Sequence, residues 1–156
     1  MTELKARIKA DLTAAMKAKD TLVVSTLRMA LSAVQYAEVA GKSARELSDA
    51  EVTAVLTKET KKRAESAEAF AGAGRAELAA KERAESEVLS TYLPAPLTDA
   101  EVTELAVRAT TVVADSTGAQ PGQRQMGQVM KEATALAAGR ADGSRLSAAV
   151  RAQLQA

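Results

Sequence analysis

The sequence predicts an all-α protein, with an N-terminal four-helix domain followed by a C-terminal three-helix tail domain. Apolar residues recur every three or four positions in seven segments, which is the spacing of one face of an α-helix. No bounded run alternates β-branched and aromatic residues with the period of two that is typical of a strand. Apolar residues make up 47% of the chain, and much of this fraction is alanine, the strongest helix former. Helices are predicted at about 4–17, 21–40, 48–71, 75–92, 98–116, 123–138 and 143–154.

The first two predicted helices are amphipathic. Their apolar stripes are Leu4, Ile8, Leu12 and Ala15 in the first, and Val24, Leu27, Leu31 and Val34 in the second. Asp20 is predicted to cap the start of the second helix, because a carboxylate there accepts a free backbone N–H. Gly41 is predicted to close that helix in the left-handed conformation.

A capping box starts the third predicted helix, because Ser48 is followed three residues later by Glu51. The expected inward residues of this helix are Val52, Val55, Leu56, Ala67 and Phe70. Residues 72–74, Gly-Ala-Gly, break the pattern before the fourth helix. Its apolar residues are Leu78, Val88, Leu89 and Tyr92, and its charged residues, expected in solvent, are Lys81, Glu82, Arg83, Glu85 and Glu87.

Pro94 and Pro96 mark the best domain boundary, since each proline disfavours helix at itself and at the residue before it. We therefore predict a helical domain at residues 1–93, a linker at 94–97 and a tail domain at 98–156. Thr98 and Glu101 form a second capping box at the start of the tail.

The three tail helices carry shorter stripes. Their expected core residues are Val102, Leu105, Ala109 and Val112, then Met126, Val129, Met130 and Ala133, then Leu146, Val150 and Leu154. Turns are predicted at residues 118–122 and between Gly139 and Gly143, with Asp142 or Ser144 capping the last helix.

Composition excludes several kinds of chemistry. The chain contains neither cysteine nor histidine. Thiolate or imidazole zinc sites, thiol nucleophiles, disulfides and histidine acid–base catalysis are therefore ruled out. The N-terminus lacks the apolar core of a signal peptide, and no run of about 18 apolar residues exists to span a membrane. We expect a cytoplasmic protein.

No residue pattern indicates a free-standing catalyst. Serines have no histidine to activate them, and no glycine-rich phosphate loop follows a predicted strand. Three glutamates, Glu82, Glu85 and Glu87, are possible carboxylate ligands, but the intervening Arg83 favours an ordinary charged surface. A group of basic residues that alternates with acidic ones is likewise interpreted as a charged surface; it consists of Lys58, Lys61, Lys62 and Arg63. We predict no catalytic residue, cofactor or metal site.

The end of the tail is mildly basic in a chain whose net charge is +1. Beyond residue 118, five bases outnumber Glu132 and Asp142; they are Arg124, Lys131, Arg140, Arg145 and Arg151. Arg124 and Lys131 lie seven residues apart, hence on one face of a continuous helix. Arg140 and Arg145 flank the glycine turn, where backbone N–H groups at a helix start attract anions. A phosphate-contacting surface and ordinary solvated charge both fit; the small surplus and the lack of a nearby aromatic favour the second on composition alone.

The succession of motifs resembles the GatB/YqeY family, most closely its free-standing YqeY-like members. The segments that carry the resemblance, in order, are LKARIKADLTAAMKAKD, STLRMALSAV, LSDAEVTAVLTKETKKRAESAEAF, AGR at residues 73–75, LAAKERAESEVLSTYLP, MGQVMK and GRADG. The same helical-plus-tail unit closes the B subunit of the glutamine-dependent amidotransferases that convert Glu-tRNA or Asp-tRNA into the amidated form. In those enzymes the tail is associated with gripping tRNA, and the catalytic parts lie in other domains and another subunit.

The resemblance therefore implies a non-catalytic, tRNA-associated accessory module. The family-level description, carbon–nitrogen ligase activity with glutamine as amido-N-donor, would apply to the whole amidotransferase-like system. By the same resemblance, Met126, Gly127, Val129 and Met130 belong to the packing helix of the tail, and Gly139, Arg140, Asp142 and Gly143 to the inter-helix turn. RNA contact is expected at Arg124, Lys131, Arg140 and Arg145. The alternative is an adaptor that binds a protein partner.

One departure from the family pattern weakens the expected positive surface. Many relatives carry a Pro-Lys pair before the glycine turn, whereas residues 132–138 contain neither residue.

Overall fold

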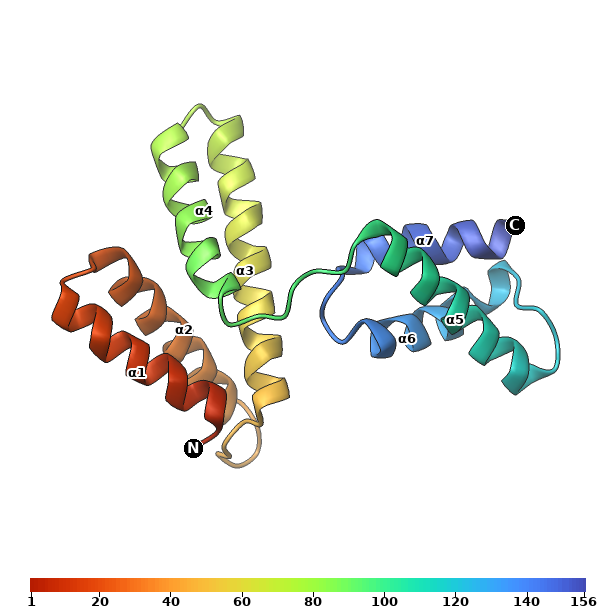
Figure 1. The fold of residues 1–156 in the computed structure, drawn as a ribbon, viewed down its shortest axis with the longest axis horizontal. Helices are drawn as coiled ribbons and strands as arrows, with labels where there is room; N and C mark the ends of the chain where they lie inside the picture. The colour runs from red at the N-terminus through yellow and green to blue at the C-terminus, as the bar shows by residue number, and fades with distance from the viewer. The chain divides into compact units, whose positions relative to one another are not determined.

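The computed structural model, which describes residues 1–156, contains seven α-helices, one short 3₁₀ turn and no strand (Figure 1). The all-α prediction is confirmed. The elements are α1 (Glu3–Ala18), α2 (Thr21–Val39), α3 (Asp49–Gly72), α4 (Ala76–Ser90), α5 (Asp99–Thr117), η1 (Gln123–Gln125), α6 (Met126–Ala137) and α7 (Gly143–Gln155). None of these helices is long and apolar enough to cross a lipid bilayer.

The chain divides into two compact units, Met1–Pro94 and Ala95–Ala156. In the first unit, α1 lies beside α2, and α3 lies beside α4 along its length (Figure 1). The two pairs meet over a hydrophobic cluster of Ile8, Leu27, Ala30, Val34, Leu47, Val52, Leu56 and Leu89. The apolar stripes of all four helices therefore supply one shared core.

The N-caps predicted for α2, α3 and α5 all form. The carboxylate of Asp20 accepts a hydrogen bond from the N–H of Val23 at 3.2 Å. Ser48 and Glu51 bond reciprocally at the start of α3, as do Thr98 and Glu101 at the start of α5. These short-range signals act within one turn, so the sequence alone specifies them.

The prediction that Gly41 closes α2 is wrong. Helix α2 ends at Val39, the following Ala40 keeps a right-handed conformation, and Gly41 is not among the residues with positive φ. The loop instead folds back on the helix end, because the N–H of Arg45 donates to the carbonyl of Glu38 at 3.0 Å. This closure does not need a left-handed glycine.

The apolar stripe of α5 also differs from its prediction at one position. Val113 is buried, whereas Val112 is 44% exposed. The reason is helical geometry: Val102 and Val113 are eleven residues apart, close to three whole turns, so both face the core.

Two charges that were predicted to lie in solvent are buried against each other. Arg63 of α3 is 4% exposed and Glu85 of α4 is 6% exposed. The Nε of Arg63 donates to Glu85 Oε2 at 3.2 Å, and its Nη1 donates to Glu59 Oε2 at 2.9 Å. Glu85 lies one turn from the buried Leu89, so it occupies a core position of α4. Burial of both charges is tolerable because each has its partner.

Tyr92 ties the end of the first unit to α1. Its hydroxyl donates to Asp11 Oδ2 at 2.6 Å, and the guanidinium of Arg7 lies 4.9 Å from the ring centroid. Burial first, and then the bond to Asp11, raise the pKa of Tyr92 above its usual value.

In the second unit, α5, α6 and α7 all pack on one another. Their core consists of Val102, Leu105, Ala106, Ala109, Val113, Val129, Ala133, Ala137, Leu146 and Val150. Leu97, Met126 and Met130 pack against its edge. This triangle of helices holds the segment predicted to contact RNA.

Candidate nucleic-acid interface

The candidate interface begins just before α6. Arg124 lies in η1, whose entry is held by a 2.8 Å bond from the N–H of Gly122 to Gln125 Oε1. Lys131 lies in the middle of α6, which starts only at Met126. The prediction that one continuous helix carries both cations is therefore wrong. A 3₁₀ turn has three residues per turn rather than 3.6, so seven-residue spacing no longer places Arg124 and Lys131 on one helix face.

Arg124 and Lys131 are nevertheless open to a ligand. Both side chains are exposed, and neither takes part in an ion pair. On the opposite side of α6, Val129 is fully buried, and Met126 and Met130 are partly buried against the core. The methionine and valine stripe thus anchors α6, and these two cations remain in solvent.

The turn after α6 uses two successive left-handed residues. Ala138 has φ 49° and Gly139 has φ 79°, so the chain reverses directly after the helix. Gly143, in contrast, is the first residue of α7 and does not have a positive φ. Of the two glycines predicted to shape the turn, only Gly139 does so through its backbone conformation.

Arg140 holds the start of the second unit in place. Its Nε donates to the carbonyl of Ala95 at 2.8 Å, and its own carbonyl accepts from the N–H of Leu97 at 2.8 Å. The pKa of Glu101 is lowered, chiefly by the backbone N–H of Thr98, and Arg140 contributes through its charge. Arg140 therefore has a structural role, and its bond to Ala95 uses only one of the five N–H donors of its guanidinium.

The helix start at α7, where backbone N–H groups were expected to attract anions, already carries a carboxylate. Asp142 caps it by accepting from the N–H of Arg145 at 2.8 Å, and the hydroxyl of Ser144 donates to the same carboxylate oxygen at 2.9 Å. The negative charge of Asp142 occupies the place that a phosphate would take. Of the two predicted capping residues, Asp142 is the cap.

Arg145 is only partly available. Its Nη2 lies 2.8 Å from Oδ1 of Asp99, a fully exposed carboxylate at the start of α5. A surface pair of this kind is weak, so another anion can replace Asp99 at little cost. The four predicted residues thus fall into two exposed cations, Arg124 and Lys131, and two that already bind atoms of their own unit.

Comparison with known proteins identifies the family of this chain. A family model described as "Yqey-like protein" matches residues 5–154. This chain belongs to the Yqey-like family. It is also similar to an uncharacterized protein of Schizosaccharomyces pombe, with 37% identity over 91 residues, which cover 58% of this chain and 72% of the yeast protein.

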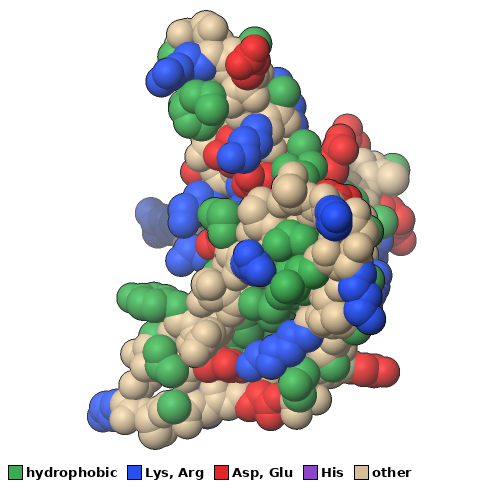
Figure 2. All heavy atoms as spheres, turned by 90° about the vertical axis from the view of Figure 1, so that its left-hand side faces the viewer, with side chains coloured by type: hydrophobic (Ala, Val, Ile, Leu, Met, Phe, Trp, Pro, Cys, Tyr) green, Lys and Arg blue, Asp and Glu red, His purple; other side chains and the backbone are tan.

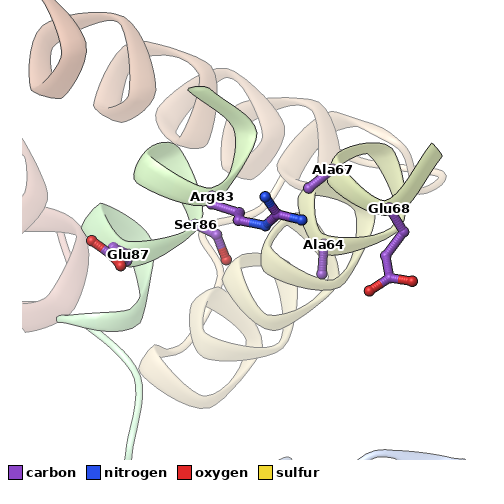
Figure 3. A pocket seen from close by; sticks show the side chains of 6 residues that line it. All are labelled: Ala64, Ala67, Glu68, Arg83, Ser86 and Glu87. Carbon is purple, nitrogen blue, oxygen red and sulfur yellow. The ribbon is translucent and has the colours of Figure 1, made fainter. Parts of the chain in front are cut away.

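The family match extends over both units, including the whole candidate interface. The matched residues also line a shallow hollow of about 300 Å³ between α3 and α4. Figure 3 shows Arg83 reaching towards Ala64 and Ala67, while Glu68 and Glu87 point away from it. Because the two carboxylates diverge, the hollow holds no carboxylate pair for acid–base work.

Sequence reasoning missed a second surface in the N-terminal unit of this Yqey-like chain. Figure 2 shows exposed hydrophobic side chains lying between Lys and Arg side chains on one face of the molecule. Among the large exposed apolar residues, Met29, Tyr36 and Val39 all belong to α2. The signal was present in the sequence, since these residues lie off the α2 core stripe of Leu27, Ala30 and Val34.

Proposed function

We propose that this chain is a tRNA-associated accessory module whose C-terminal unit contacts RNA phosphates. The observation that carries the proposal is the exposure of Arg124 and Lys131, which no acidic side chain neutralises. Arg140 and Arg145 add donors beside them once Asp99 is displaced. The resemblance of this unit to the tRNA-gripping tail of the amidotransferase B subunit supports the choice of tRNA over other polyanions.

The proposed role is binding rather than catalysis. Any carbon–nitrogen ligase activity would belong to a tRNA-dependent amidotransferase-like system in which other proteins carry the reacting groups. The chain would then hold or present tRNA in the cytoplasm. A role of this kind needs exposed cations on a folded scaffold, and the packing of α5, α6 and α7 on one another supplies the scaffold.

A salt titration of tRNA binding tests the proposal. Fluorescently labelled total tRNA is titrated with the protein at low and moderate salt, and anisotropy is recorded. Binding should weaken steeply with salt, because phosphate contacts release counterions. The double variant Arg124→Ala/Lys131→Ala should bind more weakly and lower the slope of log affinity against log salt by about 2, roughly one per lost phosphate contact.

Arg108→Ala provides the matched control, since Arg108 is exposed on α5 among acidic residues. It should leave both affinity and slope unchanged. Arg140→Ala should weaken binding less than the double variant does and should also lower the melting temperature, because it frees Ala95. Absence of any anisotropy change with tRNA at low salt would overturn the proposal.

A further inference from the structure

Helices α2 and α3 leave an open groove of about 890 Å³ between them. We call it the α2–α3 groove; its lining consists of Arg28, Met29, Ser32, Ala33, Tyr36, Ala37, Ala40, Val55, Lys58, Glu59 and Lys62. Most of the lining surface is apolar. The size is that of a typical ligand site and exceeds what a single side chain fills.

The apolar side chains of the groove are unusually open to solvent. Tyr36 is 76% exposed and Met29 is 52% exposed. Ala33 and Ala37 of α2, and Ala40 directly after it, also line the groove and contribute only small side chains. Contiguous exposed apolar surface on a small unit is typical of a binding site.

The rim of the groove is positively charged. Arg28, Lys58 and Lys62 line it against one acid, Glu59. That acid is already bound, because its Oε2 lies 2.9 Å from Nη1 of the buried Arg63. Lys58 has no ion-pair partner, and Lys62 reaches Glu59 only at 3.8 Å. The groove therefore presents cations around an apolar floor.

We propose that the α2–α3 groove docks an acidic amphipathic helix of a partner protein. A helix laid in a groove buries side chains at positions i, i+3 or i+4, and i+7, and an apolar floor of this kind accommodates them. Acidic residues flanking that stripe would meet Arg28, Lys58 and Lys62, which gives charge complementarity. The sulfur of Met29 lies 3.9 Å from Nη2 of Arg63, and its unbranched, flexible side chain suits a groove that must accommodate an entering side chain.

The lining favours a peptide over RNA. Single-stranded nucleic acid is held by successive aromatic platforms beside a cationic track. Tyr36 is the only aromatic in the groove, and alanine, valine and methionine form the rest of its apolar surface. Since no residue of the C-terminal unit lines the groove, this docking site is independent of the proposed tRNA contact.

A displayed peptide library tests the inference directly. Random peptides of about 16 residues, roughly four helical turns, are selected against the full-length protein. Enriched peptides should carry acidic residues around an apolar stripe with helical spacing. The most enriched peptide, labelled with fluorescein, should bind about tenfold more weakly to Tyr36→Ser and at least as much more weakly to Lys58→Glu/Lys62→Glu.

Two control variants match these substitutions. Lys61→Glu reverses an exposed lysine of α3 outside the groove, and Val107→Ser removes an exposed apolar residue from α5. Neither should change peptide affinity, and circular dichroism should show that every variant is folded. Failure to enrich any peptide, or enrichment of peptides that lack acids or ignore the groove variants, would overturn the inference. So would tRNA binding that depends on Tyr36 and displaces the peptide, since the groove would then be an RNA surface.

Discussion

Arg63 is a buried cation that links α3 to α4. Its guanidinium donates to Glu85 across the helix pair and to Glu59 one turn back on its own helix. A buried charge that loses its partner is costly, whereas replacing the whole pair by apolar residues is often neutral. A variant that removes only one charge of the pair is therefore expected to lose more stability than one that replaces both charges by apolar residues.

Arg63→Met should lower the free energy of unfolding by about 3 kcal/mol, because it leaves Glu85 buried without its cation. The double variant Arg63→Met/Glu85→Leu should recover most of that loss. Urea denaturation followed by circular dichroism measures both. Additive losses in the double variant would show that the pair contributes by contact area rather than by charge.

Glu51 is the carboxylate whose titration is most strongly perturbed in the first unit. Hydrogen bonds from the Arg45 guanidinium, and then from the backbone N–H of Ser48, lower the pKa of Glu51 from 4.5 to about 2. A lowered pKa in the folded protein means that the ionised form stabilises the fold. This contribution is complete above the unfolded pKa and disappears as the pH falls through the folded pKa.

Glu51→Gln should therefore lower the melting temperature most at pH values above about 5, and the difference from the parent should shrink as the pH falls towards 2. Thermal unfolding monitored across this range measures the effect. Glu68→Gln, an exposed glutamate of α3 outside the capping box, controls for the loss of one negative charge. A difference independent of pH would contradict the assigned role.

At the scale of the helix, the cap signals and most apolar stripes could be predicted from sequence, because both depend on residues within one or two turns. Ser48 with Glu51 is an example. The burial of Arg63 and Glu85 could not, since the partners lie 22 residues apart and meet only when α3 packs on α4. The burial of Val112 was predicted wrongly for a simpler reason. Steps of three and of four residues both follow a helix face, so the whole apolar stripe is needed to choose between Val112 and Val113.

The candidate interface shows the same division. Its four basic residues could be chosen from the sequence, but their hydrogen-bond and ion-pair partners within the folded unit could not. Arg140 meets Ala95 across 45 residues, and Arg145 meets Asp99 across 46. Such contacts arise from the packing of α7 against α5, which no local pattern encodes.

Two glycines of the second unit allow a matched test of helix geometry. Gly118 ends α5 with φ 75°, and Gly127 lies inside α6; an added Cβ would meet nothing within 4 Å at either site. Gly118→Ala should destabilise the unit by about 1 kcal/mol through backbone strain alone. Gly127→Ala should stabilise it by roughly 0.5–1 kcal/mol, because alanine loses less backbone entropy in a helix. Thermal melts that shift in the same direction would contradict this account.

At the scale of the whole chain, two hydrophobic cores have no residue in common. One is built from α1 to α4 with Leu47 and the other from α5 to α7. Each is closed by contacts within its own unit, Tyr92 with Asp11 in the first and Arg140 with Ala95 in the second. Cooperative unfolding is therefore expected separately for each unit.

Fragments 1–94 and 95–156 should each fold when expressed alone. The smaller one is expected to be less stable, because short chains bury a smaller share of their surface. Urea unfolding of the full chain should then show two transitions whose midpoints match those of the fragments. A fragment without helical circular dichroism would contradict the independence of the two cores.

The contacts of Arg140 also bear on where proteases can attack. Trypsin must draw an arginine side chain into a pocket with a carboxylate at its base. In the folded chain the Nε of Arg140 is bound to Ala95, and its carbonyl, the group that trypsin would attack, is bound to Leu97. The peptide bond after Arg140 should therefore resist digestion although it lies in a loop, and its cleavage would report that the second unit has opened.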